Sequence, residues 1–349
     1  MNDKKYSHVL DTFGPKIDKK MLTFFSAMMN NETLATEHTL EIIVLDSLIS
    51  EALINNNCDD GIILITNIKT GMPFYDNKLP TDSSCPTIMR AVVYLAALEH
   101  GAKPSDVMDT KDGQYVCINA DTVRDSNWRR GGYGEMSLDV AFARNSDVAM
   151  AMAIDKYLPN KYETLDSLLN MMGFTERGTI KNYRDMKELK LHPIEMLYWI
   201  NSVVKDEQPN ISAINMHYLR ETMCLHVEEG MGKGAKGAEM PIAGMTFVTH
   251  NDDMPSPAND RSAIFIGFFP AGNPCYSIYA EVHRKNFITS KIPAEICKDI
   301  VNAMSVFWNY EDFSIQNMMR RIQKEQYNEI PMTLTIPKNL QKEKAINEE

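Results

Sequence analysis

The sequence predicts an α+β fold with a five-stranded, mostly antiparallel sheet flanked by helices, together with an all-helical subdomain. Three observations favour this class: a β-branched run and turn that begin at residue 61, a largely helical middle over 155–230, and three strand-like runs in series after residue 242. Successive strands joined by short links pair as an antiparallel meander. Helices are then needed to cover the apolar faces of the sheet.

The first expected elements are a helix, a hairpin and a second, buried helix. Residues 40–53 carry apolar positions at helical spacing, and the Ile-rich run 61–66 has the β-branched composition of a strand. A short turn that contains Gly71 allows residues 72–75 to return beside it as a hairpin. The segment 87–100 is apolar nearly all round, which is typical of a helix buried on most sides.

The middle of the chain is expected to be mainly helical, and its end to hold the rest of the sheet. A loop-rich stretch reaches Met136, and helices are expected over 138–144 and again after Asp147. The meander strands and a closing helix are expected at 242–249, 262–269, 276–282 and 294–308. The glycine-rich segment 230–237 lacks the Gly-Lys-Ser/Thr ending of a phosphate-binding loop, so we interpret it as a flexible connector.

Composition argues against several classes of partner. The chain has 47 acidic and 36 basic residues, whereas a nucleic-acid-binding protein needs a basic face. No run of about 18 apolar residues occurs, so we expect no membrane span in this chain; a soluble protein and the outer domain of an anchored one both stay open. The six cysteines and eight histidines have no metal-ligand spacing, so we expect no metal or cofactor. Cys224 and His226 are interpreted as packing residues.

Four segments, taken in order, carry the clearest family signal. They are Pro86-Thr-Ile-Met-Arg90, Tyr94-Leu-Ala-Ala-Leu-Glu99, Gly131-Gly-Tyr-Gly-Glu-Met-Ser137 and Gly267-Phe-Phe-Pro-Ala271. With them, residues 38–310 resemble the transpeptidase domain of class B penicillin-binding proteins, members of the β-lactamase-like superfamily of serine acyltransferases. The expected organisation is then a lead-in at 1–37, this domain, and a partly disordered tail at 311–349. The resemblance implies a place on the periplasmic side of a bacterial cell envelope, with peptidoglycan stem peptides or cell-envelope proteins as partners.

The catalytic motifs of that family are degenerate in this sequence. The family uses a Ser nucleophile, a Lys three residues later as general base, a Ser-x-Asn motif for proton relay and substrate binding, and a Lys-Thr-Gly strand. By resemblance, these motifs fall on Thr87, Arg90, Asn145, Asp147, Met245, Thr246 and Phe247. A guanidinium is not deprotonated in proteins, so Arg90 cannot take a proton from the hydroxyl of Thr87.

The remaining substitutions remove further parts of the catalytic machinery. Asn145 lacks the relay hydroxyl, Met245 removes the cation that meets a substrate carboxylate, and Phe247 fills the place that Gly leaves for a ligand backbone. General-base assistance alone is worth about 10²–10⁴ in rate. We therefore expect no effective transpeptidase activity, and we expect Arg90 and Asp147 to form a bidentate ion pair that fills the old site.

Two literal motif matches lie outside the expected site. Ser202-Val-Val-Lys205 follows an apolar helical segment in mid-domain, and Lys69-Thr-Gly71 occupies the first hairpin turn.

The sequence leaves three hypotheses of function. The favoured one is a pseudoenzyme that acts as a binding or scaffold component linked to cell-wall peptidoglycan. The alternatives are a weakly active D,D-transpeptidase or carboxypeptidase-type acyltransferase that uses Thr87 as nucleophile, and a protein unconnected with peptidoglycan.

Overall fold

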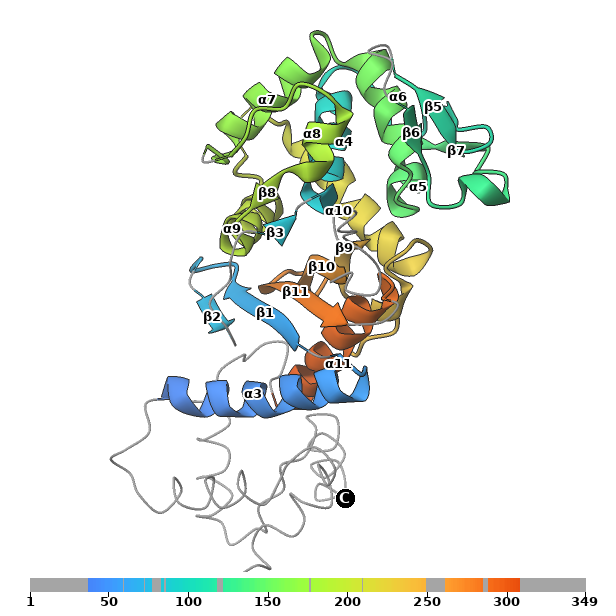
Figure 1. Cartoon of the computed structure of the whole chain (residues 1–349). Coiled ribbons are helices and arrows are strands. Elements are labelled where there is room, and N and C mark those ends of the chain that lie inside the picture. Colours follow the sequence, from blue (N-terminus) through green and yellow to red (C-terminus); the bar gives the residue numbers. More distant parts are fainter. Residues whose placement is uncertain are drawn as a thin grey trace, which may run out of the picture. The chain divides into compact units, whose positions relative to one another are not determined.

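The computed structural model describes ten stretches of the chain (Figure 1). These are residues 37–58, 60–71, 73–76, 83–84, 86–117, 122–175, 177–208, 210–248, 261–284 and 288–307. They fall into two compact units, one of residues 58–298 and one of residues 1–57 with 299–349. The smaller unit contains helix α3 (Glu37–Asn55), as expected from residues 40–53. Residues 1–36 of the expected lead-in at 1–37, and all of the expected tail at 311–349, lie outside the described residues. The expected domain limits stay predictions.

The larger unit is built on the expected five-stranded sheet, in the order β2-β1-β11-β10-β9. Its strands are β1 (Asp60–Asn67), β2 (Pro73–Asp76), β9 (Ala243–Val248), β10 (Arg261–Phe269) and β11 (Tyr276–Arg284). Every pairing is antiparallel, and the central strand places Ala280 opposite both Ile63 and Phe265. The inner strands read as nearly continuous apolar runs because both faces of the sheet are covered.

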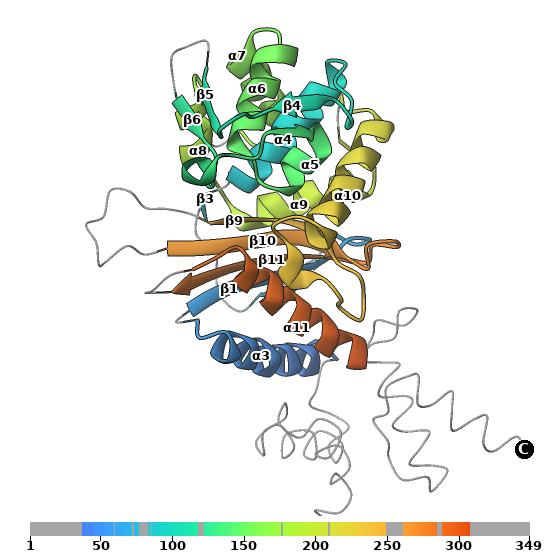
Figure 2. The same ribbon diagram turned by 90° about the vertical axis from the view of Figure 1, so that its right-hand side faces the viewer.

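Helices pack on both faces of this sheet and continue into a helical subdomain. They are α4 (Pro86–Glu99), α5 (Leu138–Ala143), α6 (Asp147–Tyr157), α7 (Lys161–Met171), α8 (Tyr183–Glu188), α9 (Pro193–Val204), α10 (Ala213–Glu228) and α11 (Lys291–Phe307). Figure 2 shows α9 and α10 on one face of the sheet, with the start of α11 on the other. None of the described helices is long and apolar enough to cross a lipid bilayer.

Helix α4 is the buried helix that the sequence predicted. Every residue from Ile88 to Leu98 is at most 5% exposed, because helices α6, α7, α8 and α10 surround it. The Tyr94 hydroxyl is satisfied by the hydroxyl of Thr222 on α10, at 3.0 Å. A buried phenol without such a partner would be costly, so this contact fixes how α4 and α10 pack together.

The helical subdomain also contains three small two-stranded sheets that the sequence analysis did not anticipate. They pair β3 (Ser83–Ser84) with β8 (Lys190–Leu191), β4 (Val107–Asp109) with β7 (Glu135–Ser137), and β5 (Gln114–Val116) with β6 (Thr122–Arg124). Strands of two or three residues are too short to show an alternating pattern in the sequence. The stretch expected to be loop-rich therefore holds four of these strands.

The interpretation of residues 230–237 as a flexible connector was wrong. At Gly230, Gly232 and Gly234 an added Cβ atom would collide with neighbouring atoms. Gly230 lies against the carbonyl of Ala143, and Gly234 lies against the carbonyl of Lys291. The segment also forms the short helix η4 (Lys233–Ala235). The glycines are thus required by close backbone packing, which composition alone could not distinguish from flexibility.

We expect Gly230→Ala to lower the free energy of unfolding by about 1–3 kcal/mol, the usual cost of overpacking. The added methyl group would displace the α5 carbonyl that accepts the Met231 N–H at 3.0 Å. Gly178→Ala is the matched control, since a Cβ atom there meets nothing within 4 Å. Urea unfolding of both variants measures the difference, and equal stabilities would contradict the packing argument.

Candidate functional site

The N-terminal end of α4 carries two residues of the predicted site. Pro86 opens the helix, where its missing N–H and fixed φ are tolerated. Thr87 follows it, although its side chain lies outside the described part of the structure. Arg90 lies one turn later and is only 5% exposed. A guanidinium this deeply buried requires partners that replace its hydration.

A tight turn between α5 and α6 brings three further residues to this end of α4. Asn145 adopts a left-handed conformation (φ 57°), which Asn tolerates better than most residues. Ser146 begins α6 by accepting the Ala149 N–H at 3.0 Å, so it caps the helix. Asp147 follows in the first turn of α6. The segment that the resemblance assigns to the Ser-x-Asn motif therefore forms the start of α6, with Asn145 and Asp147 on either side of the cap.

Arg90 is held by three groups at once. Its Nη1 donates to the Asn145 side-chain oxygen at 3.1 Å, and its Nε lies 3.5 Å from a carboxylate oxygen of Asp147. The Phe247 ring covers the guanidinium, with 5.3 Å between its carbon and the ring centroid. The expected ion pair with Asp147 is thus present, but the bidentate geometry was wrong, because the guanidinium divides its donors between an amide and a carboxylate.

Lys187 on α8 is a second cation in this site, which the sequence analysis missed. Its Nζ lies 2.9 Å from the other carboxylate oxygen of Asp147, and the Tyr183 hydroxyl donates to the Asp147 carbonyl at 3.1 Å. Burial would raise the pKa of Asp147, but the charges of Lys187 and Arg90 offset this and hold it below the usual 3.8. No motif marks Lys187, since only tertiary packing brings α8 beside α6.

The free edge of strand β9 is capped by side chains at Thr246. In the described sheet β9 is an edge strand, whose outward backbone groups are open to strand addition. At Thr246, however, the carbonyl accepts from the Asn145 amide at 2.9 Å, and the N–H donates to Nε2 of His226 at 3.1 Å. An extended peptide therefore cannot pair with β9 at this residue without displacing Asn145 and His226.

His226 is fully buried and is held in one protonation state. Because Nε2 accepts the Thr246 N–H, the neutral ring carries its proton on Nδ1. Burial, followed by the charge of Arg90, lowers its pKa from 6.5 to about 3, and the Phe142 and Ala143 backbone only partly opposes this. The expectation that His226 is a packing residue is thereby refined: it also supplies an acceptor that the sheet edge requires.

Asp125 lies behind the turn and holds it in place. Both of its carboxylate oxygens lie 3.0 Å from the Ser146 hydroxyl, and one accepts the Val148 N–H at 3.0 Å. Burial raises its pKa from 3.8 to about 6, although the hydrogen bonds from Val148 and Ser146 oppose the rise and the charge of Asp147 adds to it. Sequence reasoning did not single out this residue, because one Asp in a loop has no distinguishing pattern.

The other predicted positions lie outside this polar network. Met245, the neighbour of Thr246, is buried in the main hydrophobic cluster. Of the literal matches, Ser202 and Lys205 lie at the end of α9, and Lys69 lies in the turn after β1. The structure therefore groups Arg90, Asn145, Asp147, Thr246 and Phe247 as one constellation.

This constellation offers little chemistry. Its cations, Arg90 and Lys187, both lie beside Asp147, whose lowered pKa makes it a weak base. The accepting nitrogen of His226 is occupied by Thr246. No group of three metal-ligating side chains occurs among the residues with described side chains. The arrangement acts instead as a cross-link between α4, the α5–α6 turn, α8 and β9.

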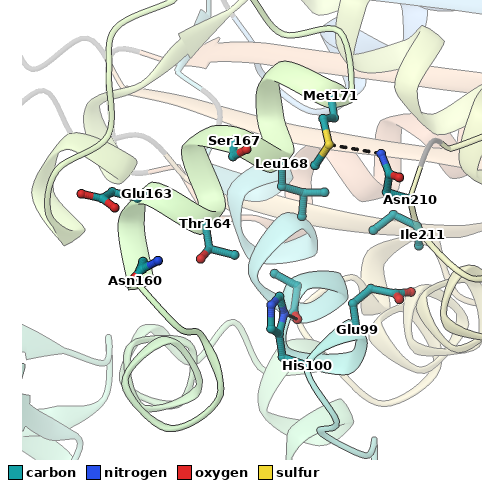
Figure 3. Close-up of a pocket in the computed structure, with 11 residues that line it drawn as sticks. Glu99, His100, Asn160, Glu163, Thr164, Ser167, Leu168, Met171, Asn210 and Ile211 are labelled. Carbon is teal, nitrogen blue, oxygen red and sulfur yellow. Dashed lines mark hydrogen bonds between the residues drawn. The ribbon is translucent and has the colours of Figure 1, made fainter.

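A cavity of about 440 Å³ lies at the C-terminal end of α4, opposite the end that carries Arg90 (Figure 3). It is lined by the end of α4, one side of α7 and residues 210–211. Glu99 accepts from the start of α10, His100 bonds the Ala96 carbonyl, and the Asn210 amide donates to the sulfur of Met171. These three polar groups therefore already have intramolecular partners.

No protein-family model and no curated protein matches this sequence. Solved structures do resemble it, each with a TM-score of 0.60. One is a peptidoglycan glycosyltransferase from Burkholderia ambifaria, 12% identical, which aligns over 74% of this chain and 92% of its own length. Another is the transpeptidase domain of penicillin-binding protein 3 from Burkholderia pseudomallei, 15% identical, over 74% and 91%. The protein therefore has the fold of a penicillin-binding protein transpeptidase domain.

Proposed function

We propose that this protein is a penicillin-binding-protein-like domain that has lost transpeptidase activity and acts as a binding or scaffold component linked to cell-wall peptidoglycan. The observation that carries the proposal is the environment of Arg90. The resemblance assigns this position to the general base, yet Arg90 is buried beneath Phe247 and bonded to Asn145 and Asp147. Such a group stabilises the fold but cannot accept a proton.

The capped edge of β9 supports the same conclusion. A peptide substrate that binds by strand addition needs open backbone groups on the edge strand. At Thr246 these groups are already bonded to Asn145 and His226. The link with peptidoglycan is inferred from the similar structures, one of a peptidoglycan glycosyltransferase and one of a penicillin-binding protein domain.

A covalent-labelling experiment tests the loss of chemistry. We expect no adduct when the protein is incubated with excess fluorescent penicillin and examined by intact mass, because the position that the resemblance assigns to the general base is Arg90, whose guanidinium cannot accept a proton. Thr87→Ala is the matched control, since it removes only the candidate nucleophile. A penicillin adduct that is present in the unmodified protein and absent from Thr87→Ala would overturn the proposal and establish the weakly active acyltransferase.

Binding is measured separately, since a pseudoenzyme can retain a ligand. Titration calorimetry with soluble peptidoglycan fragments tests the scaffold role without requiring turnover. Saturable binding supports a link with the cell wall. An absence of binding, combined with an absence of labelling, would favour a protein unconnected with peptidoglycan.

A further inference from the structure

Four arginines without carboxylate partners gather on one segment of this acidic chain. Elsewhere, Arg177 pairs with Asp166, Arg184 with Glu188, and Arg220 with Asp206. Among the residues with described side chains, no ion pair involves the arginines of residues 124–144: Arg124, Arg129, Arg130 and Arg144. All four are exposed. None of the four thus has an acidic partner among these residues, although the chain has 47 acidic residues.

Two aromatic side chains lie between these arginines. The guanidinium carbons of Arg124 and Arg129 lie 5.2 and 4.9 Å from the centroid of the Trp128 ring. Arg144 lies 5.9 Å from the ring of Tyr133. We call Arg124, Trp128, Arg129, Arg130, Tyr133 and Arg144 the arginine–aromatic surface. A guanidinium over an aromatic face keeps its N–H groups directed outward, where they can bind a carboxylate in two-point geometry.

The surface is held in place before any partner binds. Gly132 adopts a positive φ of 70° and packs so closely on residues 111–113 that a Cβ atom there would collide with their backbone. The Asn127 amide donates to the Gly132 carbonyl at 2.8 Å and closes the loop that carries Trp128. Both views place β5 and β6, of which β6 leads into this loop, away from the five-stranded sheet (Figures 1 and 2). Ordering costs on binding are reduced when a surface is fixed in this way.

The acidic residues of the same segment do not neutralise the surface. Asp125 is buried and bonded to Ser146 and Val148, and Asp139 bonds the Val140 N–H. Asp112 is exposed and accepts from Gln114, while Glu135 is exposed on β7. Nε of Arg124 donates to the side-chain oxygen of Gln114 at 3.0 Å. The other N–H groups of these four arginines remain available to carboxylates of another molecule.

We propose that the arginine–aromatic surface binds an acidic polypeptide segment of a partner protein. Arg, Trp and Tyr are the residue types that dominate the energy of protein interfaces. A nucleic acid or an anionic membrane would require a broad basic field, and the net charge of -11 opposes approach to such a surface. A short acidic segment engages only the local guanidinium groups. The inference gives the scaffold role a partner chemistry, but it does not rest on the site at Arg90.

The test uses a fluorescein-labelled poly-L-glutamate peptide and fluorescence anisotropy at low salt. We expect saturable binding to the full chain that weakens about tenfold or more in the triple variant Arg124→Gln/Arg129→Gln/Arg144→Gln. The control triple Lys103→Gln/Lys190→Gln/Lys233→Gln removes the same charge from exposed sites elsewhere and should change affinity by less than about twofold. Thermal unfolding confirms that both variants are folded.

A triple Arg-to-Lys variant at residues 124, 129 and 144 tests guanidinium geometry at constant charge. We expect it to bind the peptide several-fold more weakly than the unmodified protein, because Lys cannot form two-point contacts. If the Arg→Gln triple and the Lys→Gln control triple weaken peptide binding equally, general electrostatics explains the binding and the proposal is overturned. No peptide binding, or binding only to phosphatidylglycerol vesicles or duplex DNA, would also overturn the assignment to a protein partner.

Discussion

We expect the Asp125→Asn variant to become less stable than the unmodified protein as the pH falls. The difference between their unfolding free energies should change by about 3 kcal/mol between about pH 6 and about pH 4. Replacing His226 with glutamine is expected to have the opposite effect over the same range. Both expectations follow from two buried groups whose pKa values change in opposite directions on folding: that of Asp125 rises and that of His226 falls.

His226 makes the folded protein less stable in acid. Its pKa falls from 6.5 to about 3 on folding, so between these values the unfolded chain binds more protons than the folded one. Stability from this residue is therefore fully present above about pH 6.5 and is lost towards pH 3, a total of about 5 kcal/mol. Protonation would also break the acceptor bond from the Thr246 N–H.

Asp125 has the reverse dependence. Its pKa rises from 3.8 to about 6, so between these values the folded protein holds the proton more tightly than the unfolded chain. Stability from this residue is present at low pH and is lost as the pH rises to about 6, a total of about 3 kcal/mol. Between about pH 4 and pH 6 the two contributions nearly cancel.

Urea unfolding at closely spaced pH values measures both effects. Glutamine can accept the Thr246 N–H and asparagine can accept from Ser146 and Val148, so each variant keeps the bonds and removes the titration. The difference in unfolding free energy between variant and unmodified protein should change with pH in opposite directions for the two. If the two differences in unfolding free energy change with pH in the same direction, or do not change, the two groups do not have these shifted pKa values.

We expect Arg90→Met to destabilise the protein by about 3 kcal/mol, and Asp147→Asn by about 2 kcal/mol. Loss of Arg90 leaves the Asn145 side-chain oxygen without its donor and leaves Asp147 with Lys187 alone. Loss of the Asp147 charge removes the carboxylate that Arg90 and Lys187 share, and leaves a guanidinium with a 6% exposed side chain unpaired. Breaking one half of a buried ion pair costs more than the pair itself contributes, because the remaining charge stays desolvated.

A double-mutant cycle distinguishes this explanation from independent effects. The variant Arg90→Met/Asp147→Asn should be about 1–2 kcal/mol more stable than the sum of the single changes predicts. Arg184→Met is the matched control, since its ion pair with Glu188 is 81% and 63% exposed and should matter by less than about 0.5 kcal/mol. Strict additivity in chemical denaturation would show that Arg90 and Asp147 do not stabilise each other.

Helix α4 and the strands were readable from sequence because their signals are local. Apolar residues all round 87–100 indicated a helix buried on most sides, and β-branched runs after residues 60 and 242 indicated strands. The order of these elements, with the motif segments, sufficed to indicate the fold. The short paired strands such as β5 and β6 could not be recognised, because two or three residues carry no periodicity.

The partners of the site residues depend on three-dimensional packing. From the resemblance, Arg90 and Asp147 could be expected near each other, and the permanent charge of Arg90 follows from its residue type. The division of the guanidinium between Asn145 and Asp147, and the arrival of Lys187, depend on helices distant in sequence. The same holds for the packing of residues 230–237, where identical composition serves either a flexible or a close-packed segment.

The amino-acid sequence by itself determined the class of fold, since this depends on residue type and spacing along the chain, and the resemblance indicated which residues to examine as a candidate site. Only the tertiary structure decided which groups neutralise Arg90, which protonation state His226 holds, and whether the edge of β9 is open. Hydrogen bonds, desolvation and charge pairing act over a few ångströms. Those distances are fixed by packing between elements far apart in the sequence.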